Sequence, residues 1–509
     1  MYGEVDTGTP LALRTAEQTL GLIQLISATD DVVELKTRFH DYQAYCVAND
    51  VPLLRPIISH LESTLSSAIE AAKTKIDREL ALYSLGEVDR QTVECEQMAR
   101  LMLQTKSYVV QSFEWCAPSY DQSLANQFFD LRGQKNTTVN YERYESKEVE
   151  AIERQLADIL SYSTEKTAVL LTSSGMSAYA VVEAFITREL LKDYLDTVLV
   201  SPYIYFEASG QLTTLNSLNV VFATSYETEQ MLDSAETLQP KVIFLDPLSN
   251  TPEQRLIDLD AFFEKLGGRI IDRVTVVIDG TMSPGCYKDK WRTHSGNVDI
   301  IYYESCSKYL QLGFDNTMSG YVLAPVEWKK KMAEIRRNTG AILARDCANT
   351  FPRYSAATLW KRMDVIQRNA MAVVDYFDKL PAIHKLIEVH YPGHHTHPDF
   401  NVGKQYRTLG GCVSFKFHSG NGYDKLNRFI SELIGVCKAN NVQLIKGVSF
   451  GHTIPRISAS SAMAGFDKPY IRLFVGALES DSILELCKAI EYSLLEGKYL
   501  GSGNVDEPA

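Results

Sequence analysis

The chain has 509 residues, of which 45% are hydrophobic and 23% are charged, and its formal net charge is −13. This length allows two or three domains with substantial cores, and the acidic balance disfavours a nucleic-acid-binding surface. The nine cysteines are scattered and form no CxxC pair. That pattern indicates a reducing compartment and argues against a disulfide scaffold or a zinc site, so we expect no metal.

The hydropathy pattern of the sequence also shows no membrane-spanning or secretion signal. No apolar run approaches the length of a membrane span, and the first ten residues, MYGEVDTGTP, lack the hydrophobic core of a signal peptide. We therefore expect a cytoplasmic protein with no membrane partner and no nucleic-acid partner.

The N-terminal part, residues 1–115, shows apolar positions at three- and four-residue spacing, which predicts one helix after another. The predicted helices cover 15–26, 32–47, 53–82 and 88–110, with breaks at 28–31, 49–52 and Gly86. No candidate chemistry is concentrated here. We interpret this part as an accessory helical domain or an interface.

Strands and helices alternate in the middle of the chain. Strands are predicted at 168–171, 198–200, 220–222, 242–245, 274–278 and 319–323, with helices at 148–160 and 177–190. This alternation predicts an α/β domain with a mostly parallel sheet and helices on both faces. We place this large domain at residues 116–375.

The C-terminal part has a different pattern. A long helix predicted at 358–380 leads to strands at 412–417 and 470–475 and to helices at 423–439 and 482–495. This mixture predicts a small α+β domain at residues 376–509.

Two segments carry features that suit a phosphate. The turn Thr172-Ser173-Ser174-Gly175-Met176 opens a predicted helix, whose first N–H groups and dipole favour an anion. Arg143 lies between two tyrosines ahead of another helix and could clamp a phosphate. The alternatives are an ordinary helix cap and an ordinary turn with exposed aromatic rings. No GxGxxG or GxxxxGK[ST] motif indicates a dinucleotide or ATP site.

Lys308 follows an apolar run at 298–301 and the small residues Ser305, Cys306 and Ser307. A lysine at the end of a buried strand becomes nucleophilic through desolvation, which suits a Schiff base with an aldehyde cofactor. The two serines could hold that cofactor's phosphate. The alternative is a solvated loop lysine.

Asp279 ends the apolar strand predicted at 274–278. Open α/β sheets place ligand contacts at this edge of the sheet. A pyridoxal cofactor needs a carboxylate against its ring nitrogen. A helix cap or turn role is the alternative for Asp279 alone, but its combination with Lys308 favours the cofactor.

Seven blocks occur in a fixed order: YERY at 141–144, SSGMSA at 173–178, DPLSN at 246–250, IDGTM at 278–282, ESCSKYLQLGFD at 304–315, SFG at 449–451 and YIRLFVGALE at 470–479. Together they resemble the fold-type I pyridoxal-phosphate (PLP) enzymes of the cystathionine γ-synthase and methionine γ-lyase family of Cys/Met metabolism. The resemblance covers residues 140–495 and implies an enzyme with the aspartate aminotransferase-like fold.

The resemblance implies roles for individual residues. The catalytic residues it implies are Lys308 as the Schiff-base lysine, Asp279 on the pyridine nitrogen, and Tyr141. The implied phosphate contacts are Ser174, Gly175, Met176, Ser305 and Ser307, with Tyr141 and Arg143 reaching in from a neighbouring subunit. The implied ring contacts are Tyr205, Asn250 and Thr281. The implied substrate contacts are Arg472, Ser449, Val448 and Glu207.

Three positions depart from the family pattern. Glu207 stands where the family's Y-G-G-T motif has a glycine, and Gly313-Phe314 replaces a glycine-histidine pair. Val448 replaces the usual glutamate before the serine of SLG. The N-terminal helices have no counterpart in the compact bacterial members.

The resemblance implies PLP-dependent γ-elimination or γ-replacement on an activated amino acid, through a vinylglycine-type ketimine. O-acyl-homoserine, methionine and S-adenosylmethionine fit this scheme, and capture by a carbon nucleophile stays open. Val448 cannot pair with an ammonium group, so we expect cystathionine to be a poor substrate. The alternatives are a cystathionine synthase or lyase and a non-catalytic scaffold. The implied assembly is a homodimer or homotetramer with shared active sites.

Overall fold

The computed structural model describes residues 16–48, 55–81, 88–114, 146–193, 195–215, 218–294, 296–419, 422–459 and 469–496. Internal contacts divide the chain into two compact units. The first unit comprises residues 1–181 and 305–362, and the second comprises residues 182–304 and 363–509. The predicted domain limits at 115 and 375 stay a prediction.

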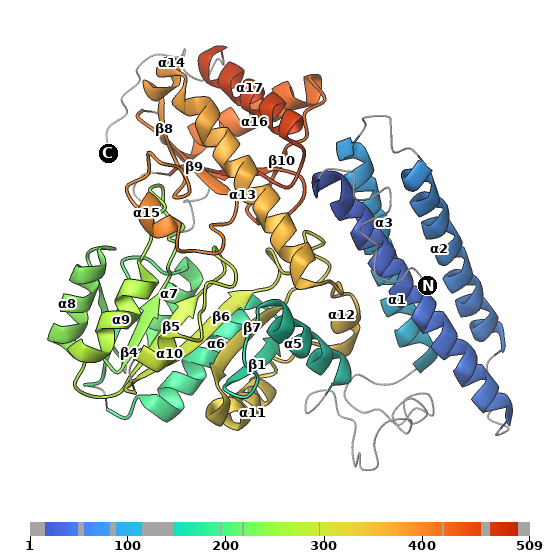
Figure 1. Ribbon diagram of the computed structural model, residues 1–509, viewed down its shortest axis with the longest axis horizontal. Coiled ribbons are helices and arrows are strands. Elements are labelled where there is room, and N and C mark those ends of the chain that lie inside the picture. The colour runs from blue at the N-terminus through green and yellow to red at the C-terminus, as the bar shows by residue number, and fades with distance from the viewer. Residues whose placement is uncertain are drawn as a thin grey trace. The chain divides into compact units, whose positions relative to one another are not determined.

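Three long helices begin the first unit: α1 (Ala16–Ala48), α2 (Arg55–Ala81) and α3 (Val88–Glu114). They lie side by side in Figure 1 and share one apolar core, which includes Leu25, Phe39 and Leu65. The predicted break at 28–31 is wrong, because α1 is continuous there. Asp31 is buried and forms an ion pair with Lys106 of α3, 3.3 Å away, so a residue that looked like a helix breaker joins two helices.

The rest of the first unit surrounds a pair of strands. Strand β1 (Thr167–Thr172) runs antiparallel to β7 (Gly320–Pro325), with Thr167 opposite Pro325 and Thr172 opposite Gly320. The helices are α5 (Lys147–Ile159), α6 (Gly175–Phe185), α11 (Lys329–Thr339), α12 (Arg345–Asn349) and the first turns of α13 (Ala356–Asp378). A π-helical segment (Ile186–Leu190) follows α6, and a 3-10 turn (Val326–Trp328) precedes α11.

The second unit contains a parallel sheet in the order β6-β5-β4-β2-β3. Its strands are β2 (Thr197–Val200), β3 (Asn219–Phe222), β4 (Val242–Leu245), β5 (Val274–Asp279) and β6 (Val298–Ser305). Its helices are α7 (Phe206–Thr214), α8 (Thr228–Leu238), α9 (Leu259–Arg269) and α10 (Trp291–His294). Strands β4 and β5 are buried along their whole length, as a parallel sheet covered on both faces requires. The predicted mostly parallel sheet is therefore confirmed.

The second unit also contains a smaller sheet in the order β10-β11-β12-β9-β8, which is antiparallel except where β10 pairs with β11. Its strands are β8 (Ile387–His390), β9 (Cys412–Phe417), β10 (Ile445–Lys446), β11 (Arg456–Ala459) and β12 (Ile471–Phe474). The helices beside it are α14 (Pro381–His384), α15 (Phe400–Gly403), α16 (Tyr423–Ala439) and α17 (Ser480–Glu496). The predicted α+β character is confirmed, although the short strands β8, β10 and β11 were not predicted.

None of the helices in the described ranges combines the length and the apolar character that a bilayer crossing needs.

Candidate active site

Lys308 lies in the turn that follows β6, and it is half-buried. The loop behind it is fixed by the buried side chain of Gln311, whose Nε2 donates to the Thr317 carbonyl at 2.6 Å and to Ser319 Oγ at 3.2 Å. The Cys306 N–H also donates to the Ser319 carbonyl at 2.9 Å. These bonds hold the backbone on both sides of Lys308, so the lysine has a defined starting position.

The N-terminal helices contact this lysine loop within the first unit. Gln24 of α1 donates to the Leu312 carbonyl at 3.2 Å, and Arg100 of α3 donates to the Gly313 carbonyl at 3.2 Å. Phe314 is only 1% exposed and belongs to the apolar core of the three helices. The replacement of the family's histidine by Phe314 therefore has a physical reason, because this side chain fills a helical core.

The phosphate-side residues lie at the N-terminus of α6. The Ser174 hydroxyl accepts from the Ser177 N–H at 3.0 Å and donates to the Ser177 hydroxyl at 2.9 Å. A Cβ added to Gly175 would lie 2.7 Å from Ser305 Cβ, so only glycine lets the helix end approach the end of β6. First-turn N–H groups have no acceptor within their own helix. Together with the serine hydroxyls they fit a phosphate group.

Ser307, Met176, Tyr141 and Arg143 were also predicted phosphate contacts. The Ser307 hydroxyl accepts from the Ser319 N–H at 3.2 Å and so supports the lysine loop. Met176 lies in the first turn of α6. Tyr141 and Arg143 lie outside the described residues, so their roles stay predictions.

Asp279 is the last residue of β5 and is 8% exposed. Burial raises the pKa of Asp279, while hydrogen bonds from Thr281 and from the Tyr303 side chain lower it. The Thr281 N–H donates to Asp279 Oδ1 at 2.9 Å. Thr281 therefore contacts Asp279 directly, and its contact with the cofactor ring stays a prediction. These donors favour the ionised carboxylate that a pyridinium nitrogen needs.

Asp246 is a buried carboxyl group that the sequence analysis missed. It follows β4 and is 4% exposed. Burial raises the pKa of Asp246 well above its ordinary value, and the charge of Asp279 raises it further. Asp246 therefore holds its proton more tightly than an exposed aspartate does. Its position at the end of a buried strand was the available signal.

Arg472 of β12 is buried, and its guanidinium group is held by neutral acceptors. Nη1 donates to Asn250 Oδ1 at 2.7 Å, and Nη2 donates to the Val448 carbonyl. The Phe450 ring lies 5.3 Å from the guanidinium carbon. Within the described ranges, no carboxylate forms an ion pair with Arg472. Its charge is therefore available to the carboxylate of an amino acid.

Asn250 connects Tyr470 to Arg472. The Tyr470 hydroxyl lies 2.9 Å from the Asn250 carbonyl oxygen and 3.2 Å from Oδ1. Tyr203 is buried nearby, and burial raises the pKa of this tyrosine. Tyr470 was not predicted, yet it contacts the amide that holds Arg472.

Tyr205 immediately precedes α7 and is half-buried. Burial, and next the charge of Glu207, raise the pKa of Tyr205 to about 12. The charges of Asp279 and Arg472 act on the same phenol. Glu207 is exposed, and its charge acts on the Tyr205 phenol.

Val448 and Ser449 precede Phe450 on the segment that contacts Arg472. The Val448 side chain is 71% exposed, and its carbonyl is the group that contacts the guanidinium. Ser449 is half-buried. The backbone of Val448 thus contacts Arg472, and the substrate roles of Val448 and Ser449 stay predictions.

Comparison with known proteins identifies the family. The model of the Cys/Met metabolism PLP-dependent enzymes matches residues 91–486. The bifunctional enzyme flvA of Aspergillus flavus is 32% identical over 404 residues, which are 78% of this chain and 48% of that protein. The L-methionine gamma-lyase of Fusobacterium nucleatum is 24% identical over 395 residues, covering 76% of this chain and 91% of that protein.

A solved structure agrees on the fold. The cystathionine gamma synthase of Xanthomonas oryzae pv. oryzae in complex with cystathionine has a TM-score of 0.57 at 20% identity, covering 72% of this chain and 90% of that chain. The chain belongs to the Cys/Met metabolism PLP-dependent enzyme family and is a fold-type I enzyme that uses PLP. It spans about half the length of flvA.

Proposed function

We propose that this enzyme catalyses γ-elimination or γ-replacement on an activated amino acid of the O-acyl-homoserine, methionine or S-adenosylmethionine type. The observation that carries this proposal is the guanidinium of Arg472, held by Asn250 and the Val448 carbonyl. A buried cation with only neutral partners suits the α-carboxylate of an amino acid.

PLP, when bound, supplies an electron sink that stabilises a carbanion at the substrate α-carbon. Ser174, Gly175 and Ser305 would hold its phosphate, and Asp279 would pair with its ring nitrogen. Lys308 Nζ removes the α-proton and returns a proton during the later shifts that expel the γ-substituent. Arg472 would hold the substrate carboxylate so that the α-proton stays within reach of Lys308 Nζ.

Glu207 favours a cationic side chain among the candidate substrates. The charge of its carboxylate acts on the Tyr205 phenol, and the carboxylate oxygens carry lone pairs for a ligand. A sulfonium group beside this carboxylate gains an attraction that a neutral ester or thioether lacks. S-adenosylmethionine is therefore the substrate type that the described side chains favour. In a replacement reaction, the incoming group could be a carbon nucleophile.

Cystathionine is the second candidate, because a structural neighbour is a cystathionine gamma synthase that was solved with cystathionine. Its distal ammonium would meet Val448, which carries no charge. Within the described residues, Glu207 is the candidate carboxylate for that ammonium. Because Val448 offers that ammonium no charge, we rank cystathionine below a sulfonium substrate.

The test is a mass-spectrometric turnover screen of O-acetyl-homoserine, methionine, S-adenosylmethionine and cystathionine with the purified enzyme. Formation of a 2-oxo acid with ammonia reports elimination, and an adduct with added nucleophile reports replacement. Glu207→Gln should lower kcat/KM for the sulfonium about 10-fold and spare the neutral substrates. The exposed Glu264→Gln change is the matched control. Cystathionine turnover above that of every other candidate would overturn the proposal.

We also propose that the active sites are shared between subunits, with Tyr141 and Arg143 serving the partner's phosphate. An Arg143→Ala chain mixed with a Lys308→Ala chain should regain part of the activity, because one hybrid site is intact. Verified mixed dimers that stay inactive would contradict shared sites.

A further inference from the structure

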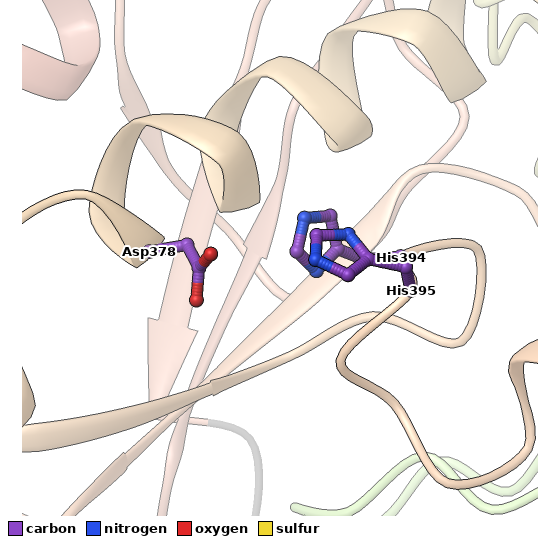
Figure 2. Close-up of side chains that lie close together, drawn as sticks. All are labelled: Asp378, His394 and His395. Carbon is purple, nitrogen blue, oxygen red and sulfur yellow. The ribbon is translucent and has the colours of Figure 1, made fainter.

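A cluster of metal-binding side chains lies in the second unit, among residues that the proposed reaction does not use. Asp378 lies at the C-terminal end of α13, and His394 and His395 lie in the turn after β8. Each offers a ligand atom, and the three atoms lie within 4.8 Å of one another. Figure 2 shows the Asp378 carboxylate and the two imidazole rings gathered between the helix end and the turn.

The turn that presents the histidines is tightly bonded. The His394 N–H donates to the Tyr391 carbonyl at 3.0 Å, and the His397 N–H donates to the His394 carbonyl at 3.0 Å. The Tyr391 hydroxyl donates to the Gly410 carbonyl at 2.9 Å. Two successive turns therefore fix the backbone that carries His394 and His395.

His394 is the rigid member of the cluster. It is 1% exposed, and its ring nitrogens contact Thr396 Oγ1 at 2.7 Å and Asp375 Oδ1 at 3.1 Å. A metal bound at either nitrogen replaces one of these contacts and leaves the other to fix the ring. Metal-binding histidines have such an arrangement in proteins, with one nitrogen on the metal and the other on an oxygen.

Asp375 adds a second carboxylate on the same face of α13, three residues before Asp378. The His394 and His395 rings have centroids 4.2 Å apart and are tilted by 51°, so they do not stack flat against each other. Asp378 and His395 are exposed and can rotate toward a shared ion. Zinc–nitrogen bonds are about 2.0–2.1 Å long, so the three ligand atoms must move slightly closer together to share one ion.

We propose that His394, His395 and Asp378 bind a divalent transition metal of the zinc type, with Asp375 as a further ligand or as the partner of His394. Two imidazoles with carboxylates suit zinc-like ions better than calcium or magnesium, which prefer all-oxygen sites. The expectation of no metal rested on the cysteines. The sequence pattern did not indicate this site, because α14 and β8 separate Asp378 from His394 and His395 along the chain.

The metal would restrain the backbone of the segment that follows β8. His397 contacts the Glu253 carbonyl at 2.8 Å, and Asp399 forms a bidentate pair with Arg255 at 2.7 and 3.0 Å. A metal that fixes this turn therefore also supports residues 253–255, which follow Asn250.

The test uses the PLP-loaded full chain after treatment with a chelator. Titration calorimetry with Zn²⁺ should show one site per chain, and Zn²⁺ should raise the thermal midpoint because it binds the folded state. Asp378→Asn and His395→Ala should each weaken binding about 10-fold or more. His294→Ala, which removes an exposed histidine from α10, should bind Zn²⁺ like the unchanged protein.

Both chosen variants change exposed side chains, so they should fold and keep their PLP. Loss of the Zn²⁺ signal in both, with retention in His294→Ala, supports the site. The absence of binding to the unchanged protein, or equal binding by all the variants, overturns it.

Discussion

The phosphate-side residues of the first unit and the substrate-side residues of the second unit are built in different ways. Ser174, Gly175 and Ser305 are small, and their geometry rests on backbone approach and a helix N-terminus. Asp279 and Arg472 are charged and buried, and each is held by specific side-chain or backbone partners. The first region is therefore sensitive to added volume, and the second is sensitive to a lost charge or a lost partner.

The strongest test of the first region is Lys308→Ala. Removal of the proton-transfer group should lower turnover by at least about 10²–10⁴-fold. Borohydride reduction of the unchanged enzyme, followed by peptide mapping, should place the cofactor label on Lys308. A label on another lysine would refute the assignment.

The N-terminal helices give the second test of that region. Phe314→Ala leaves a cavity in their shared core and should lower stability by about 3–5 kcal/mol. Because Phe314 follows the lysine loop, PLP retention should also weaken, as measured by the visible absorbance after dialysis. Phe314→Leu is the matched control and should lose less of both. An unchanged melting temperature in Phe314→Ala would show that the helices do not brace the loop.

Arg472→Ala sharpens the comparison from the substrate side. Loss of the charge-assisted contact should cost about 2–5 kcal/mol in substrate recognition, seen as a higher KM or a lower kcat/KM. The variant should stay yellow, because the role proposed for Arg472 is to hold the substrate and not the cofactor. A folded but colourless variant would place Arg472 on the cofactor side instead.

Asp246→Asn tests the buried acid pair by pH and has the smallest expected effect. The folded-state pKa of Asp246 is raised by burial and by Asp279, so the folded protein holds this proton more tightly than the unfolded chain. The stability of the PLP-free protein should then fall as pH rises above about 4, with a slope from this group of up to about 1.4 kcal/mol per pH unit. The loss continues until the pH passes the folded-state pKa.

Asp246→Asn should flatten that slope, as measured by urea unfolding at several pH values. The Asp272→Asn change, at a side chain that is 74% exposed, should leave the slope unchanged. An identical slope in Asp246→Asn and the unchanged protein would show that Asp246 ionises normally.

The sequence motifs and their order along the chain were enough to predict the fold class and the cofactor and to choose many candidate residues. Apolar runs predicted buried strands because a parallel sheet covered on both faces leaves no polar face. Lys308 and Asp279 were chosen as candidates because each lies at or just after the end of such a strand. The helix break predicted at 28–31 was wrong because the partner of Asp31 is Lys106, 75 residues away in the chain.

Tertiary contacts decided the remaining features, because they join residues far apart in sequence. Phe314 looked like a departure in the active-site loop, yet its side chain belongs to the core of α1, α2 and α3. Asn250 becomes a holder of Arg472 only when two segments 222 residues apart meet. The Asp378, His394 and His395 cluster likewise forms only when the chain between α13 and the turn after β8 folds back. The local sequence pattern determines where helices and strands form and where strands end. Charge pairs and side-chain clusters depend on the packing of segments that are distant in the chain.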